Sequence, residues 1–421
     1  MGQSKMSSDS PRQGIVVVGA GAAGLMAAIA AAATAPSATP VIVVEKNRRP
    51  GVKILVSGGG RCNLTTTVTG PALEAAFGKA AARWLRHALR AFPPSALRAF
   101  IESTGVALHE EALEKVFPVS GRAGDVLEAL LRRAREAGVA IETERPVTAI
   151  RREADGFRID TPAGPLAARR VILAAGGRSY PQMGTTGDGY ALAASLGHSV
   201  TPTVPALAPL AVDLDWVHAL SGLTLPDAVI AVEDVDGRHL ATRRRPLLFT
   251  HRGLSGPGPM DVSGWVAAAG AGCALVLDLA PDLPRERVDA ALRAGGARPT
   301  HALLPEALPE RLRRALAAQA GADVPAASLD RAARLRLVDA VKSLRLPVAG
   351  TLGFAKAEVT RGGIPLDEVD PRTMASRLVP GLFICGELLD VDGPIGGYNF
   401  QAAFATGRLA GLQASLPGET G

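Results

Sequence analysis

Cysteine is scarce in this sequence, and the three cysteines lie far apart. Cys62, Cys273 and Cys385 form no CxxC pair, and their odd number argues against a framework of disulfide bonds. The seven histidines include no HExxH pair, so we expect no metal site. Unpaired thiols suit a reducing compartment, and the protein is expected to be cytoplasmic.

Aromatic residues are also few, at 4% of 421 residues, whereas apolar residues make up 47% and charged residues 20%. These proportions are typical of a globular protein, and its core must be packed mainly with Ala, Val and Leu. A chain of this length exceeds what one hydrophobic core usually organises, so several domains are expected. The net charge of +6 is mild. It fits an anionic cofactor or a small-molecule substrate and does not demand nucleic acid.

One apolar run, residues 14–36, is long enough to be mistaken for a signal peptide or a membrane span. It begins with the β-branched residues of Ile15–Val18, breaks at closely spaced glycines and continues as a helix of small residues. A second β-branched strand, Val41–Val44, follows and ends in Glu45. Strand, glycine turn, helix and strand make a βαβ unit, so we expect neither a targeting segment nor a membrane anchor.

The glycines of this unit follow the dinucleotide-binding pattern GxGxxG. Gly19 permits the tight turn, Gly21 lets a pyrophosphate approach the backbone, and Gly24 lets helix and strand pack closely. Free N–H groups at the helix start favour phosphate. Glu45 follows roughly 20 residues later, where a carboxylate accepts hydrogen bonds from a ribose hydroxyl and repels a 2′-phosphate. The motif predicts cofactor contacts from Gly19, Gly21, Ala22, Ala23, Gly24 and Glu45.

A second segment, residues 57–63, is too dense in glycine for a plain connector. Three consecutive glycines let backbone N–H groups converge on an anion or a flat ring, and two polar side chains offer hydrogen bonds. A flexible linker, which is the alternative, would carry Ser and Gly without the Arg-Cys-Asn core. We therefore expect cofactor contacts from Ser57, Gly58, Gly59, Gly60, Arg61, Cys62 and Asn63.

Two further strands end in glycine. The strand Arg170–Ala175 runs into a glycine pair, and near the C-terminus the strand of GLFICGE precedes DVDGPIGGYN, which opens a second helix. Ligands bind at the carboxyl ends of parallel strands, and a helix N-terminus there would favour negative charge on the ligand. The predicted contacts are Gly176, Gly177, Gly386, Glu387, Asp390, Gly396, Gly397, Tyr398 and Asn399.

With these motifs together, the chain resembles the two-dinucleotide-binding-domain flavoproteins. It is most similar to the bacterial family described as BaiN-like, aminoacetone-oxidase-like or 3-dehydro-bile-acid Δ4,6-reductase-like. The resemblance rests on stretches such as VVVGAGAAGLMAA, SGGGRCNLT, VILAAGGRSYPQMGTTGDGYALAASLGH and GLFICGELLDVDGPIGGYNFQAAFATGRLAG. It implies an α/β, Rossmann-type fold that binds FAD, with additional contacts from Lys46, Lys53 and the backbone near Val147. The chain departs from the family pattern at Thr65-Thr66, where Thr-Asn is expected.

Residues 1–13 are polar, rich in Ser and without periodicity, so we expect a disordered tail there. The resemblance implies how the domains after it are arranged. The N-terminal part of the FAD-binding domain covers residues 14–198. An antiparallel, β-barrel-like domain over 199–280 and a small helical domain over 281–347 are inserted. Residues 348–421 return to complete the FAD-binding domain. Frequent prolines with short strand-like runs, and then helical spacing in an Arg-, Ala- and Leu-rich segment, agree with these insertions.

In a flavoenzyme the flavin carries out the redox step. We expect an FAD-dependent oxidoreductase that uses NAD(P)H to reduce a small unsaturated or carbonyl compound. Only one GxGxxG is present, so the nicotinamide would bind transiently beside the flavin. Two alternatives stay open: an O₂-dependent oxidase of a small amine or alcohol, and an RNA-associated or redox-sensing flavoprotein. The oligomeric state is not predicted.

The candidate catalytic residues are His251, Tyr398 and Cys62. His251 lies in the run FTHRGLSGP and could donate a proton near neutral pH, with a purely structural histidine as an equal alternative. Cys62 and Cys385 lack the close CxxxxC spacing of a redox dithiol. Further candidates on the substrate side are Tyr180, Arg252, Thr360 and Arg361.

Overall fold

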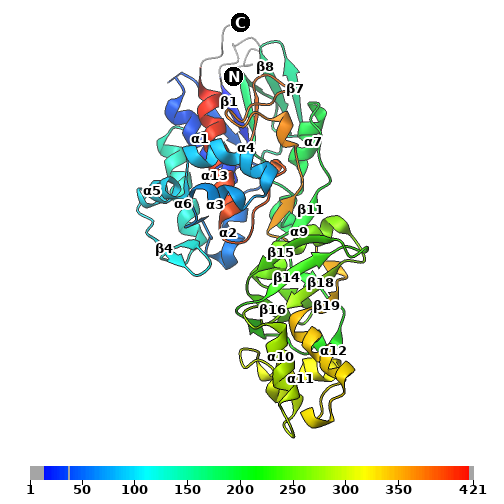
Figure 1. Ribbon diagram of the computed structural model, residues 1–421. Coiled ribbons are helices and arrows are strands. Elements are labelled where there is room, and N and C mark those ends of the chain that lie inside the picture. The colour runs from blue at the N-terminus through cyan, green and yellow to red at the C-terminus, as the bar shows by residue number, and fades with distance from the viewer. Residues whose placement is uncertain (1–13, 37, 417–421) are drawn as a thin grey trace. The chain divides into compact units, whose positions relative to one another are not determined.

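The computed structural model describes residues 14–36 and 38–416, and the chain folds into two compact units. Unit 1 combines the described residues up to Thr203 with those from Val359 onward, and unit 2 comprises Val204–Glu358. Unit 1 therefore contains both the blue and the red segments of the chain, and unit 2 the yellow ones (Figure 1). The division at 203/204 and 358/359 differs from the expected boundaries at 198/199 and 347/348. The predicted tail, residues 1–13, lies outside the described residues.

A five-stranded parallel sheet forms the centre of unit 1. Its strand order is β22–β10–β1–β2–β6, and each neighbouring pair is parallel. Four of the five strands are apolar runs whose side chains are mostly buried, which is typical of parallel sheets. The bounds are Ile15–Val18 (β1), Val41–Val44 (β2), Ala140–Glu142 (β6), Arg170–Leu173 (β10) and Leu382–Ile384 (β22).

Two helices from opposite ends of the chain, α1 (Ala22–Thr34) and α13 (Tyr398–Ser415), pack closely together (Figure 1). A Cβ added to Gly407 would lie 2.3 Å from the backbone oxygen of Ala23, and one added to Gly411 would lie 2.1 Å from that of Ala27. Only glycine permits this approach. The C-terminal segment therefore completes the domain that the N-terminal βαβ unit begins.

Smaller elements surround this core. They include two antiparallel sheets, β3–β5–β4 and β7–β8–β9. Two helices rather than one follow Thr69, because the chain turns between them at Gly78 with a φ of +79°. The bounds are Val52–Val56 (α2), Gly70–Ala75 (α3), Lys79–Ala91 (α4), Pro94–Glu102 (α5), Ala123–Glu136 (α6), Asp188–Ser195 (α7), Thr65–Thr66 (β3), Leu108–Glu111 (β4), Lys115–Pro118 (β5), Ala149–Glu153 (β7), Gly156–Asp160 (β8) and Leu166–Ala168 (β9).

Unit 2 contains two antiparallel sheets, with strand orders β15–β14–β18–β19 and β13–β16–β17–β12–β20. Its three longer C-terminal helices share one buried cluster with the sheets, in which Leu277 of β18 and Leu337 of α12 both lie. The β domain and the helical insertion therefore form one unit. The bounds are Leu210–Ala211 (β12), Thr224–Leu225 (β13), Val229–Glu233 (β14), His239–Arg244 (β15), Leu247–Thr250 (β16), Gly253–Ser255 (β17), Ala274–Asp278 (β18), Leu344–Pro347 (β19), Gly350–Thr351 (β20), Asp215–His218 (α8), Arg285–Arg293 (α10), Glu310–Gln319 (α11) and Arg331–Lys342 (α12).

One helix of unit 2, α9 (Pro257–Ala269), is absent from the sequence-based expectation. Its first residues read as a turn because glycine and proline alternate there. However, Pro257 stands at the first helical position, where a missing N–H costs nothing. Val262 and Val266 then bury the inner face.

None of the helices in the described part of the chain is long and apolar enough to cross a membrane. Nor do residues 14–36 and 38–416 gather three or more His, Cys, Asp or Glu side chains in a group that could hold a metal ion.

Candidate functional site

The turn between β1 and α1 holds three glycines with different roles. Gly19 has a φ of +101°, and a Cβ on Gly24 would lie 1.9 Å from the Gly19 backbone oxygen, so both serve the protein's own packing. Gly21 has an ordinary φ of −78°, and an added Cβ would meet no protein atom within 4 Å. No side chain caps the start of α1. Open space and uncapped N–H groups are what a phosphate requires here.

Glu45 at the end of β2 is buried, and the backbone fixes its carboxylate. Oε2 accepts a hydrogen bond from the Ala20 N–H at 2.8 Å, and Oε1 accepts one from the Asn47 N–H at 2.9 Å. Each carboxylate oxygen can accept a further bond. The side chain is therefore held at the pocket wall with accepting capacity left for a ligand hydroxyl.

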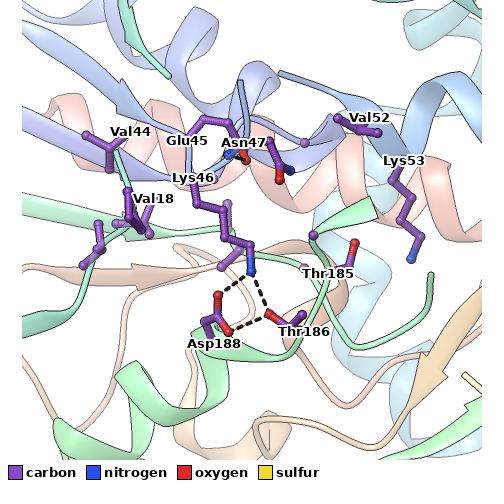
Figure 2. Close-up of a pocket in the computed structure, with 18 of the residues that line it drawn as sticks. Val18, Val44, Glu45, Lys46, Asn47, Val52, Lys53, Thr185, Thr186 and Asp188 are labelled. Carbon is purple, nitrogen blue, oxygen red and sulfur yellow. Dashed lines mark hydrogen bonds and ion pairs between the residues drawn. The ribbon is translucent and has the colours of Figure 1, made fainter. Parts of the chain in front are cut away.

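An open pocket lies at the carboxyl ends of these strands (Figure 2). The open position at Gly21 and the carboxylate of Glu45 both line it, so its wall fits the pyrophosphate and ribose of a dinucleotide. The lining residues are Val18, Gly19, Gly21, Val44, Glu45, Lys46, Asn47, Gly51, Val52, Lys53, Arg145, Pro146, Val147, Ala174, Ala175, Gly176, Met183, Gly184, Thr185, Thr186, Gly187, Asp188 and Leu192.

A polar clasp joins two walls of this pocket. Lys46 donates to the Thr186 hydroxyl at 2.7 Å and forms an ion pair with Asp188 of α7, as the dashed lines in Figure 2 show. The Thr186 hydroxyl in turn donates to Asp188 at 2.6 Å. Burial alone would raise the pKa of Asp188, but the bonds from Lys46 and Thr186 outweigh it and hold that pKa below its usual value. The carboxylate is therefore charged at neutral pH.

A second polar cluster extends from Lys53, which lines the same pocket. Its ammonium donates to the Ser179 hydroxyl at 2.6 Å and pairs with Oε2 of Glu387. Oε1 of Glu387 accepts hydrogen bonds from Ser179 at 3.0 Å and from the Thr360 N–H at 2.8 Å. Ser179 follows β10 and Glu387 follows β22, so the cluster lies at the carboxyl ends of two neighbouring parallel strands.

Two glycines and a tyrosine belong to the same region. A Cβ on Gly177 would lie 2.4 Å from the Thr360 hydroxyl, and one on Gly386 would lie 2.7 Å from the Ala23 Cβ. The Tyr190 hydroxyl donates to the backbone oxygen of Glu387 at 3.3 Å. Burial, followed by the negative charges of Glu387 and Asp390, raises the pKa of Tyr190, so this phenol stays a neutral donor.

The glycine-rich segment 57–63 forms a tight turn in which its own side chains are largely engaged. Arg61 binds both oxygens of Glu111, at 2.7 and 3.3 Å, and its guanidinium lies 4.1 Å from the centre of the Phe117 ring. The Ser57 hydroxyl donates to the Ile54 backbone oxygen. A Cβ on Gly59 would meet nothing within 4 Å. The exposed backbone of this turn, rather than Arg61, is thus what is open to a ligand.

The start of α13 packs against this turn. A Cβ on Gly397 would lie 2.2 Å from the Thr65 backbone oxygen, and in the orientation that satisfies its amide, Asn63 accepts from the Gly397 N–H at 3.0 Å. Asn399 bonds both backbone groups of Gly393. The remaining predicted residues are occupied within the protein: Tyr398 is buried edge-on against Phe77, beside Gly396, and Asp390 accepts from the Thr201 hydroxyl.

The structure argues against thiol chemistry. Cys62 and Cys385 are buried, and burial raises the pKa of each thiol to about 12. At neutral pH neither provides the thiolate that a nucleophile or a redox thiol requires. A catalytic role for Cys62 is therefore not supported.

His251 lies in unit 2, exposed at the turn between β16 and β17. The structure thus places it outside the unit that carries the pocket and the Lys53 cluster. Its neighbour Arg252 is exposed at the same turn.

Several residues of the site have no counterpart in the sequence-based prediction, notably Asn47, Thr186 and Asp188 of the pocket and Ser179 of the Lys53 cluster. A signal was present, because Gly187 has a φ of +86° and ends a glycine turn that opens α7. Helix α7 thus begins directly after a glycine, as α1 does after Gly21, but without the GxGxxG spacing.

Comparison with known proteins agrees with this geometry. The HI0933-like protein Rossmann domain family matches residues 13–413. A 3-dehydro-bile acid delta(4,6)-reductase of Clostridium scindens is 34% identical over 411 residues, covering 95% of this chain and 98% of that protein. A ribosomal RNA dihydrouridine synthase of Escherichia coli is 31% identical over 403 residues, covering 93% and 95%. The protein of that name from Haemophilus influenzae is 30% identical over 408 residues, covering 95% and 98%.

A solved structure shares the fold across nearly the whole chain. It is the 3-ketosteroid delta1-dehydrogenase of Sterolibacterium denitrificans, with a TM-score of 0.51 at 15% identity and coverage of 96% of this chain and 99% of that one. The chain belongs to the HI0933-like Rossmann-domain family and is an FAD-dependent oxidoreductase.

Proposed function

We propose that this protein uses FAD to transfer a hydride from NAD(P)H to a carbon–carbon double bond conjugated with a carbonyl group. The balanced reaction consumes NAD(P)H and one proton and yields NAD(P)⁺ and the saturated carbonyl compound. The curated relatives support this chemistry by their names. One reduces delta(4,6) bonds of a 3-dehydro-bile acid, and two form dihydrouridine, which is uridine saturated at a double bond conjugated with a ring carbonyl.

The observation that carries the proposal is the position of Lys53. This residue lines the pocket and is also bonded to Ser179 and Glu387 at the strand ends. The pocket is thus continuous with a group of proton-bearing side chains. When bound there, FAD would supply the hydride transfer, and these side chains would orient it and hold charge beside it.

The chain's own residues then have distinct tasks. The uncapped start of α1 binds the pyrophosphate, and Glu45 binds the ribose. The Lys46 clasp closes over this half of the cofactor, while Lys53, held by Glu387, places a positive charge at the other half. We propose FAD contacts from Gly19, Gly21, Ala22, Ala23, Gly24, Glu45, Lys46, Lys53, Ser57, Gly58, Gly59, Gly60, Cys62, Asn63, Val147, Gly176, Gly177, Gly386, Glu387, Asp390, Gly396, Gly397, Tyr398 and Asn399, through the backbone where the side chain is engaged elsewhere.

An anaerobic experiment tests the reaction. NADH or NADPH is expected to bleach the visible flavin bands within seconds. A cyclic enone added next is expected to restore them, whereas the saturated ketone of the same ring, as the matched control, is not. If the bands persist with both nicotinamides while a small amine or alcohol bleaches them, and only O₂ restores them, the enzyme is an oxidase and the proposal fails.

The clasp leads to a separate prediction. Asp188→Asn removes the ion pair with Lys46 but keeps an amide that can accept from Thr186. Partly exposed ion pairs contribute about 0.2–1 kcal/mol, so FAD should dissociate about 1.5- to 5-fold faster, and added salt should reduce the difference. Stopped-flow measurement of FAD release checks this, with Asp367→Asn, an exposed aspartate outside the pocket, as the matched control. Equal release from both variants would exclude the clasp from cofactor retention.

A further inference from the structure

The outward face of α4 carries basic residues and no acidic ones. Lys79, Arg83, Arg86, His87 and Arg90 are all exposed and recur at intervals of three and four positions, so they share one side of the helix. We call these five residues the α4 basic face. The opposite side is apolar and buried, and the Trp84 indole N–H donates to the Val369 backbone oxygen at 3.1 Å. The helix is therefore fixed to unit 1 with its charges outward.

The absence of acidic residues within the helix itself separates α4 from the other basic helices. Among the described helices with more than one Lys or Arg, α4 alone contains no Asp or Glu. In the run Arg243–Arg245, the densest basic stretch of the sequence, two of the three arginines pair with carboxylates. Arg244 binds Asp227 and Asp282, Arg245 lies 3.3 Å from Asp261, and Arg243 covers the Trp265 ring. Such pairing is what a solvated or structural arginine shows.

A carboxylate beside the α4 basic face, that of Glu74, orients two of its arginines. Glu74 of α3 is buried and accepts from Nε of Arg86 at 3.0 Å and from Nε of Arg90 at 2.8 Å. Burial would raise the pKa of Glu74, but these bonds hold it below its usual value, so the carboxylate stays charged. The bonds use Nε in both arginines, and more than half of each arginine side chain remains exposed. Glu74 thus supplies one negative charge against the four Lys and Arg residues of α4.

We propose that the α4 basic face binds the phosphate backbone of a folded RNA that carries the substrate uridine. The inference rests on the proposed reduction of a conjugated double bond and names the class of its substrate. A helix of 13 residues is about 20 Å long and can contact several consecutive phosphates. An excess of fixed, exposed positive charge is complementary to such a polyanion. Two relatives that match nearly the whole chain act on ribosomal RNA by name, which favours RNA over another polyanion.

The test compares two double variants of the FAD-loaded protein. Lys79→Gln/Arg83→Gln removes two charges from the α4 basic face. Arg287→Gln/Arg331→Gln removes two exposed charges from unit 2 and serves as the matched control. Binding to a fluorescently labelled, uridine-containing RNA hairpin is measured by anisotropy over a range of salt concentrations. The α4 variant should bind about 10-fold more weakly at ~0.1 M salt, and its log–log salt slope should fall by roughly 1 to 2. The control should stay within about 2-fold of wild type.

Three outcomes would contradict RNA binding by the α4 basic face. The first is that both double variants weaken RNA binding equally. The others are that the wild type binds no RNA, or that it binds anionic vesicles but not the hairpin. Turnover of the free cyclic enone tests the proposed reaction independently of RNA binding. The α4 variant should turn over the enone at the wild-type rate, because these residues lie outside the pocket. If the wild type does not reduce the enone, the proposed reaction is refuted, and the anisotropy measurement still tests whether the α4 basic face binds RNA.

Discussion

Gly21→Ala is expected to abolish tight FAD binding while leaving the apoprotein folded. The Gly21 backbone has an ordinary φ, and the added Cβ meets no protein atom, so the free energy of unfolding of the apoprotein should change by less than about 1 kcal/mol. The same Cβ enters the space proposed for the pyrophosphate. The FAD dissociation constant should rise about 10- to 100-fold, which is about 1.4–2.8 kcal/mol. Thermal unfolding of the apoprotein and fluorescence titration with FAD measure the two effects separately.

Gly24→Ala is the matched comparison, three positions along the same turn. Its Cβ would lie 1.9 Å from the Gly19 backbone oxygen, so the turn itself must shift. This variant should lose stability even without cofactor, by roughly 3 kcal/mol or more, or fail to fold. Unchanged FAD affinity in Gly21→Ala would mean that the pyrophosphate does not bind at this turn.

Glu387→Gln and Lys53→Met are expected to move the flavin midpoint potential in opposite directions. In Glu387→Gln the amide oxygen can still accept from the Thr360 N–H, but Lys53 loses its counter-charge. The uncompensated ammonium should favour the reduced, more negative flavin and raise the potential by about 30 mV, equivalent to about 1.4 kcal/mol for a two-electron couple. Lys53→Met leaves the carboxylate uncompensated and should lower the potential by a similar amount.

Dye-equilibration titration of the FAD-loaded variants measures these shifts. Stability should also fall in both variants, by about 1–3 kcal/mol, because each leaves a partly buried group without its charged partner. A fall in stability with no change in potential would show that the Lys53 cluster is purely structural and that the flavin lies elsewhere. General damage to the fold would not shift the midpoint potential upward in one variant and downward in the other, so the opposite signs distinguish a charge effect from misfolding.

The parts of this molecule that could be predicted are those encoded locally. The βαβ unit from Ile15 to Glu45 has its strand, turn and helix signals within a few residues of each other, and the structure has these elements where they were expected. The α/β Rossmann-type fold, the family and the enzyme class predicted from the motifs are likewise confirmed. Helix α9 was missed because glycine and proline at a helix start resemble a turn when they are read in isolation.

The side-chain partners could not be predicted because they depend on distant segments. Lys46 meets Asp188 across 142 positions, and Lys53 meets Glu387 across 334. No periodicity or spacing in the sequence links these residues. For the same reason, Arg61 was expected to bind the cofactor, whereas its guanidinium is committed to Glu111 and Phe117.

Whether this pocket holds FAD is tested most directly by the visible spectrum of the purified protein. We expect flavin absorption bands at about one FAD per chain, or their appearance when the apoprotein is incubated with excess FAD and then desalted. If the protein stays colourless after that incubation, although thermal unfolding shows that it is folded, the pocket does not bind FAD.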